Sequence, residues 1–199
     1  MEAKKEIIIF GGSFNPPTLA HQAIMKKCLE QPGYDEVWVM PSGDRIDKEI
    51  TASDAERLAM LHQVKGEVFA GNERLHVSDF ELNLSRPTQT IRTLGALATA
   101  YPDVHFWFVY GADSYASMAT WQSGDRLQRE MSCQLMARAG YRLPPETMRV
   151  RHLPAMEDCL VGMSSTVVRE RLARREAVKD LVCRSVMSYI QERKLYQTA

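Results

Sequence analysis

The sequence lacks a continuous apolar run of the roughly 18 residues that a membrane-spanning helix requires, so no membrane partner is expected. Its first residues, 1–6, are polar and lack the apolar stretch of a secretory signal. Cysteine is scarce, with four residues, and none is spaced as Cys-x-x-Cys or as a zinc site. These absences favour a cytoplasmic protein with reduced thiols.

Net charge is also absent, because 25 basic residues balance 25 acidic ones. A nucleic-acid partner is therefore not expected, since such proteins usually carry a basic surface. No histidine pair has metal-ligand spacing, and no Ser-His-Asp or Cys-His arrangement is apparent. We therefore expect neither a metal held by protein ligands alone nor a covalent nucleophile. The sequence leaves the oligomeric state open, a homo-oligomer included.

Strand-like and helix-like segments alternate along the chain. Apolar, β-branched runs fall at 7–10, 37–40, 75–77, 104–110, 133–137 and, more weakly, 148–153. Helical periodicity falls at 18–30, 53–65, 89–100, 113–119, 166–174 and 178–193. The alternation predicts an α/β protein with a doubly wound parallel sheet, a single domain over 1–199 whose C-terminal part, 162–199, is helical. Ligands of such sheets bind beyond the carboxyl ends of the strands, where strand order reverses.

The stretch 10–21 reads Phe-Gly-Gly-Ser-Phe-Asn-Pro-Pro-Thr-Leu-Ala-His and directly follows an apolar run. The adjacent Gly11 and Gly12 permit close backbone approaches, and N–H groups here and at the following helix start can face an anion. If Thr18 is the N-cap of that helix, His21 lies at position N3, beside any anion bound there. The pattern fits a phosphate site with His21 as proton donor, although a plain strand–turn–helix carries the same signal.

A second candidate anion site lies near the other end of the chain. Three consecutive hydroxyl residues, 164–166, precede a helical pattern, and either Ser165 or Thr166 would serve as its N-cap. Arg169 and Arg171 then fall in or near the first turn, where the helix dipole disfavours cations unless an anion is bound. We interpret Arg169 as functional and Arg171 as a surface residue.

These two motifs resemble the signatures of the nucleotidyltransferases that carry a (His/Thr)-x-x-His segment and a late Ser-(Ser/Ala)-Thr-x-x-Arg segment. Within that superfamily the chain is most similar to nicotinate mononucleotide adenylyltransferases. The stretches that narrow the resemblance are 86–94 (Arg-Pro-Thr-Gln-Thr-Ile-Arg-Thr-Leu), 111–114 (Gly-Ala-Asp-Ser) with Thr120-Trp121, and 138–141 (Arg-Ala-Gly-Tyr). The resemblance covers almost the full length of the chain. It implies a Rossmann-like nucleotidyltransferase fold and adenylyl transfer from ATP with Mg²⁺.

The resemblance also implies roles for individual residues. The catalytic residues would be Thr18, His21 and Arg169. The residues that bind ATP would be Gly11, Gly12, Ser13, Phe14, Lys48, Gly111, Asp113, Ser164, Ser165 and Thr166. The residues that bind the pyridine nucleotide would be Asn15, Thr90, Trp121 and Arg138. Asp113 could equally be an N-cap, Trp121 a core residue, and Arg138 a surface cation.

The chain departs from the family pattern at four places. Thr18 replaces the first histidine, Ala20 replaces a glycine, and Ala139 replaces a proline. The loop after the second strand lacks the family's Pro-Pro-His-Lys pattern, and Lys48 is the candidate replacement for its base. The alternatives are the same reaction on nicotinamide mononucleotide, another transferase of the superfamily acting on phosphopantetheine or an alcohol phosphate, and a nucleotide sensor without turnover.

Overall fold

A computed structural model describes residues 4–43 and 50–197. Its centre is a six-stranded parallel sheet with the strand order β3-β2-β1-β4-β5-β6. The strands are β1 (Lys5–Gly12), β2 (Glu36–Pro41), β3 (Leu75–Val77), β4 (Val104–Gly111), β5 (Ser132–Met136) and β6 (Val150–His152). Strand order reverses between the adjacent β1 and β4, so the doubly wound sheet is confirmed, with its switch point at these two strands.

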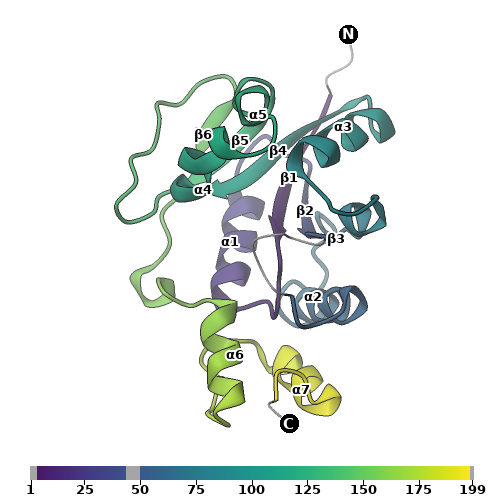
Figure 1. Ribbon diagram of the computed structural model, residues 1–199, viewed down its shortest axis with the longest axis vertical. Coiled ribbons are helices and arrows are strands. Elements are labelled where there is room, and N and C mark those ends of the chain that lie inside the picture. The colour runs from purple at the N-terminus through teal and green to yellow at the C-terminus, as the bar shows by residue number, and fades with distance from the viewer. Residues whose placement is uncertain (1–3, 44–49, 198–199) are drawn as a thin grey trace.

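Helices connect the first five strands in turn, β5 leads to β6 without a helix, and two further helices follow the sheet. The helices are α1 (Leu19–Glu30), α2 (Asp54–Val68), α3 (Thr90–Ala100), α4 (Ala112–Ser117), α5 (Gly124–Glu130), α6 (Ser165–Ala173) and α7 (Arg184–Arg193). Short 3₁₀ turns lie at 80–83, 118–120 and 158–160. Figure 1 shows α6 and α7 together at the end of the molecule opposite the start of β1.

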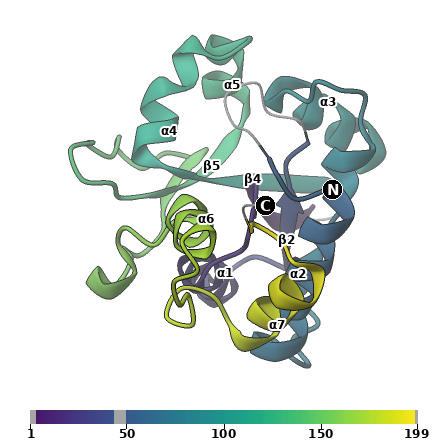
Figure 2. The same cartoon turned by 60° about the horizontal axis from the view of Figure 1, so that its bottom comes forward.

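Alternation along β1 divides the core into two layers, because successive side chains of a strand point to opposite faces. Ile8 and Phe10 pack with α1, α2, α6 and α7 in one cluster. Ile7 and Ile9 pack with α3, α5 and the turn at 118–120 in the other. Figure 2 shows the same division, with α3, α4 and α5 on one side of β4 and the remaining helices on the other.

The observed helices differ from those expected at two places. The expected helix at 178–193 begins only at Arg184, because the buried Val178, Leu181 and Val182 belong to a turn before it. The helix α5 was not expected, since it is short and buries only two of its residues, Gly124 and Leu127. Within the described residues, no helix is both long enough and apolar enough to cross a membrane.

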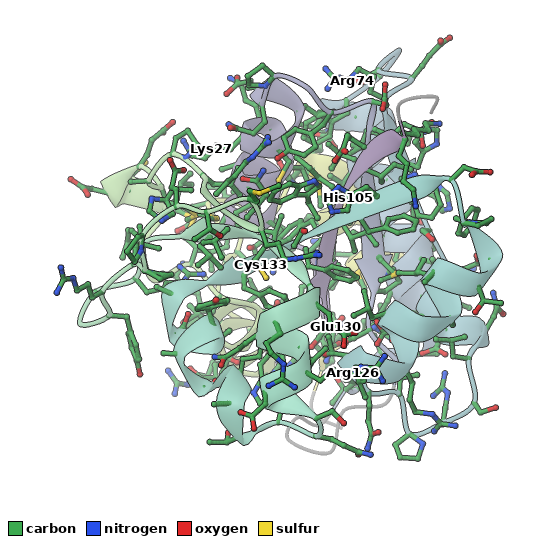
Figure 3. All side chains as sticks on the ribbon, turned by 90° about the horizontal axis from the view of Figure 1, so that it is seen from above. Lys27, Arg74, His105, Arg126, Glu130 and Cys133 are labelled. Carbon is green, nitrogen blue, oxygen red and sulfur yellow. The ribbon has the colours of Figure 1, made fainter. Side chains whose placement is uncertain are left out.

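The amino edge of the sheet carries a partly buried polar network. His105 lies between Glu6, whose carboxylate is 3.1 Å from Nδ1, and Ser132, whose hydroxyl is 2.9 Å from Nε2. The order Ser–His–Glu is that of a hydrolase triad, but Ser132 is only 2% exposed. The network therefore joins β1, β4 and β5 at the edge where Figure 3 labels His105.

Candidate active site

The turn after β1 is held by close contacts among its own residues. Phe14 has a left-handed backbone, φ 48°, and its buried ring meets the His21 ring edge-on with centroids 5.1 Å apart. A Cβ at Gly12 would lie 3.2 Å from the Phe14 ring, so a larger residue here would press the ring out of its present position. The Phe14 ring therefore packs against both Gly12 and His21.

Thr18 is the N-cap of α1 and His21 is at N3, as predicted. The backbone N–H of Thr18 donates to His21 Nδ1 at 2.9 Å, and Thr18 Oγ1 lies at the same distance from that nitrogen. Because Nδ1 accepts from a backbone donor, the proton of the neutral ring lies on Nε2. Thr18 is fully buried, so its place is beside the imidazole and not at the surface.

Arg57, on α2, is a buried cation that the sequence analysis did not identify. It is 1% exposed, donates to the carbonyl of Ser13 at 2.9 Å, and forms an ion pair with Asp54 at 2.7 Å. Asp54 also forms an ion pair with Arg86. The hydrophilic sequence around Arg57 offered no sign of burial. The hydrogen bond from Arg57 fixes the Ser13 carbonyl and so helps to set the direction of the turn after β1.

The late motif lies against this turn. Ser164 is the N-cap of α6 and accepts from Val167 N at 3.3 Å, so the expectation of Ser165 or Thr166 as the cap was wrong. The Ser165 hydroxyl instead donates to the carbonyl of Pro16 at 2.8 Å. With Ser164 as the cap, Arg169 lies five residues into the helix and therefore beyond its first turn. The expected repulsion between its positive charge and the helix dipole is weaker there.

Arg169 connects the two motifs directly. Its Nη1 donates to the carbonyl of Asn15 at 2.8 Å, and its Nη2 donates to Thr166 Oγ1 at 3.3 Å. Arg171 forms an exposed ion pair with Asp180, which agrees with its interpretation as a surface residue. The structure thus brings together the two segments that lie at opposite ends of the sequence.

The carboxyl end of β4 forms another part of the site. Gly111 ends the strand, and a Cβ there would overlap the Asp113 carboxylate and lie 2.9 Å from Arg138 Nε. The N-cap of α4 is Gly111, so Asp113 lies within the first turn and is not the cap. Its Oδ1 is buried without a hydrogen-bond partner in the described part of the chain, 3.8 Å from Arg138 Nε. An unsatisfied acceptor of this kind suits a hydroxyl donor from a ligand.

A cavity of about 610 Å³ opens between β1, β4 and α3. Four of the predicted site residues line it: Gly11, Gly12, Thr90 and Trp121. Other residues that line the cavity were not predicted as site residues, among them Ser42, Thr88, Gln89 and Gln122. Thr88 and Gln89 lie within the stretch 86–94, and Gln122 directly follows Trp121. Their closeness in sequence to these motifs is the only signal that could have identified them as cavity residues.

The cavity combines an aromatic wall with polar groups that have no partner. Trp121 meets Tyr110 edge-on with ring centroids 5.7 Å apart. The hydroxyls of Ser42 and Thr88 are buried and form no hydrogen bond with any described residue. The amino end of α3, at Thr90, also borders the cavity and has no side-chain cap. These groups provide hydrogen-bond donors for an anionic or polar ligand group.

The remaining predicted residues lie elsewhere or outside the described residues. Asn15 is 1% exposed, does not line the cavity, and its carboxamide is bonded within the protein. Arg138 lies beside Asp113 rather than in the lining of the cavity. Lys48 falls outside the described residues. Cys133 is no nucleophile, because burial raises the pKa of its thiol to about 12.

The fold and the paired motifs define a nucleotidyltransferase, and comparison with known proteins agrees. The chain belongs to the Cytidylyltransferase-like family, whose model matches residues 9–171. It is 34% identical to a probable nicotinate-nucleotide adenylyltransferase of Exiguobacterium sibiricum, over 97% of this chain and 100% of the relative. It is 32% identical to one from Bacteroides thetaiotaomicron, over 92% of this chain and 90% of the relative. The predicted resemblance is confirmed.

Solved structures show the same fold. Plasmodium falciparum nicotinic acid mononucleotide adenylyltransferase complexed with NaAD superposes with a TM-score of 0.82 at 22% identity, covering 96% of this chain and 97% of that one. Its complex with APC gives a TM-score of 0.79. The Rossmann-like nucleotidyltransferase fold is therefore confirmed, and the chain is an enzyme of this class.

Proposed function

We propose that this protein transfers the adenylyl group of ATP to nicotinate mononucleotide, giving nicotinate adenine dinucleotide and pyrophosphate for NAD biosynthesis. One observation carries the proposal: the cavity walled by Trp121 borders Gly12 of the turn and contains the unpartnered hydroxyls of Ser42 and Thr88. A flat apolar wall suits a pyridine ring. The hydroxyls and the uncapped amino end of α3 suit a carboxylate on that ring.

The reaction requires positioning more than a strong base. A phosphate oxygen of the mononucleotide attacks the α-phosphorus of ATP, and the new P–O bond forms as the bond to the β-bridging oxygen breaks. Pyrophosphate leaves with that electron pair. The attacking oxygen is already anionic at neutral pH, so the reaction needs no nucleophilic side chain. Charge on the leaving group must instead be neutralised by fixed donors.

We assign His21 Nε2–H to the α-phosphate and the leaving oxygen. The support is the backbone bond from Thr18 to Nδ1, which fixes the ring as a donor at its other nitrogen. Thr18 then acts by positioning the imidazole, because it is fully buried. Backbone N–H groups of Gly12, Ser13 and Phe14 complete the proposed phosphate contacts.

We assign the β- and γ-phosphates to the amino end of α6, residues 164–166, with Arg169. Two of the five guanidinium N–H donors of Arg169 bond to Asn15 and Thr166, which fixes its head group beside the turn. On the adenosine side, the unsatisfied Oδ1 of Asp113 would accept from a ribose hydroxyl, as acidic residues do in related folds. Arg138 would assist from beside Asp113.

Mg²⁺ fits this site as an ion carried by the triphosphate. Among the described residues, no group of three or more His, Cys, Asp or Glu side chains could hold a metal. Mg²⁺ usually keeps several waters and binds through substrate phosphates rather than an all-protein cage. When bound it neutralises charge on the triphosphate.

Pyrophosphate release with ATP and Mg²⁺ tests the proposal, with nicotinate and nicotinamide mononucleotides compared at matched concentrations. We expect a strong preference for nicotinate. A preference for nicotinamide would move the protein to the sister activity. ATP binding without pyrophosphate release from either mononucleotide would favour a sensor.

A further inference from the structure

The C-terminal end of the chain returns to the turn that follows β1. After α7, Lys194 adopts a left-handed conformation, φ 53°, and the N–H of Leu195 bonds back to the carbonyl of Ile190 at 3.0 Å. This helix end turns the chain so that Tyr196 reaches the interior. Its hydroxyl donates to Asn15 Oδ1 at 2.8 Å. A residue three places from the C-terminus therefore contacts the first motif.

Asn15 is a junction of four chain segments. Its carboxamide oxygen accepts from Tyr196 and from the N–H of Ala52, at 3.2 Å, and its Nδ2 donates to Thr51 Oγ1 at 3.3 Å. Its backbone carbonyl accepts from Arg169. With 1% exposure, Asn15 depends on these partners, because a buried amide left unbonded is costly.

The position of Asn15 gives this junction its importance. It follows Phe14, which packs against His21, and it precedes the segment that ends at the N-cap Thr18. A shift of Asn15 would therefore move the ring of Phe14 and the start of α1 together. Even a displacement of about 1 Å would reduce the rate of catalysis strongly, because reacting groups must be held close to their productive geometry.

The phenol of Tyr196 is suited to act as a permanent donor. Burial raises its pKa above the ordinary value, in spite of the opposing effect of Arg169, so the hydroxyl keeps its proton throughout the neutral range. The ring packs against the core formed by α1, α2 and α7, and this packing would survive removal of the hydroxyl alone. The hydrogen bond is therefore separable from the fold.

We propose that Tyr196 is a positioning residue for the nucleotide turn, acting through Asn15. The proposal rests on the proposed function only for its kinetic consequence. Its structural consequence, restraint of the turn by a donor from the C-terminus, can be measured without turnover.

The test compares Tyr196→Phe with Tyr189→Phe, which removes a phenol from α7 away from the turn. Tyr189 borders a surface groove between α2 and α7, and it contacts Arg193 through its ring. The first measurement is amide hydrogen exchange of peptides covering 10–18. We expect faster exchange there in Tyr196→Phe, with unchanged exchange in Tyr189→Phe. Equal exchange in the two variants would overturn the proposal, whether or not the enzyme turns over.

The second measurement is steady-state pyrophosphate release by the same proteins. Loss of one hydrogen bond that orients the turn should lower kcat/KM for ATP about 10-fold in Tyr196→Phe. Tyr189→Phe should retain the wild-type value. A wild type without activity would refute the proposed function, and the exchange result would still decide the role of Tyr196. An active wild type with an equally active Tyr196→Phe would refute the positioning role.

Discussion

The imidazole of His21 is held in place through Nδ1 and its ring, which leaves Nε2 to carry the proton as a donor. Its Nδ1 receives the backbone N–H of Thr18, and its ring rests on Phe14. We expect His21→Ala to lower kcat by about 100-fold, because the donor acts chiefly when charge develops in the transition state. Mononucleotide affinity should change little.

Pyrophosphate release measures the rate of this variant, and calorimetry measures its affinity for nicotinate mononucleotide. His62→Ala, on the exposed side of α2, is the matched control and should behave as wild type. If His21→Ala kept a rate within about twofold of wild type, the imidazole would have no part in transfer.

Trp121 lines the cavity, and its contact with Tyr110 leaves the ring available as a wall. We expect Trp121→Ala to weaken nicotinate mononucleotide by roughly 1–3 kcal/mol, the usual cost of losing an aromatic stacking partner. Trp121→Phe should recover most of that affinity. An equal loss of ATP affinity in Trp121→Ala would remove the residue from the pyridine site.

At the residue scale, the sequence predicted those contacts that are local in the chain. The cap Thr18 and the N3 residue His21 are three residues apart, so their relation follows from helix geometry. The junction at Asn15 could not be predicted, because its partners lie near residues 51, 169 and 196. No pattern in the sequence specifies which distant hydroxyl reaches a given amide.

At the element scale, the helix α7 begins at a carboxylate from another helix. Glu67, near the end of α2, accepts from the backbone N–H groups of Arg184 and Ser185 at 3.2 and 2.6 Å. Hydrogen bonds from Ser185 lower the pKa of Glu67 below its ordinary value. The bond therefore stabilises the fold above the pKa of an unfolded glutamate, and the stabilisation is lost as pH falls through the lower folded value.

We accordingly expect Glu67→Gln to lower Tm at neutral pH, and the difference from wild type to shrink as pH falls below about 4. Glu192→Gln, an exposed residue of α7 beside the same groove, is the control. Thermal unfolding of the three proteins across this pH range measures the effect. A difference that stayed constant with pH would mean that the carboxylate charge of Glu67 does not hold α7.

The strands were predicted more accurately than the helices, and the reason is physical. The four central strands, β2, β1, β4 and β5, are mostly buried on both faces, so each appears in the sequence as a short apolar run, whereas the edge strand β6 has one buried residue and a weaker run. Helices of one or two turns leave weaker patterns, and α5 was missed for this reason. The segment before α7 was assigned to the helix because Val178, Leu181 and Val182 are apolar at helical spacing, although they form a buried turn.

At the scale of the whole molecule, the C-terminal helical part and the sheet meet at residues 15–19. The carbonyl of Leu181 accepts from Leu19 N at 2.8 Å, beside the bonds from Ser165 and Arg169 to the same segment. The cavity proposed for the pyridine nucleotide lies on the other side of β1, against α3. We therefore expect the proposed ATP phosphate site to depend on this junction, and the proposed mononucleotide site to be independent of it.

This division predicts that Arg169→Ala separates the two substrates. A ligand at about 100 times its Kd stabilises the folded protein by about 2.7 kcal/mol, which raises Tm by several degrees in a protein of this size. We expect Arg169→Ala to lose most of the rise produced by ATP, because the proposed function assigns its guanidinium to the β- and γ-phosphates. The rise produced by nicotinate mononucleotide should remain. Arg171→Ala, which removes only an exposed ion pair with Asp180, should keep both. If Arg169→Ala lost both rises together, Arg169 would hold the molecule together rather than bind ATP, and the two sites would not be independent.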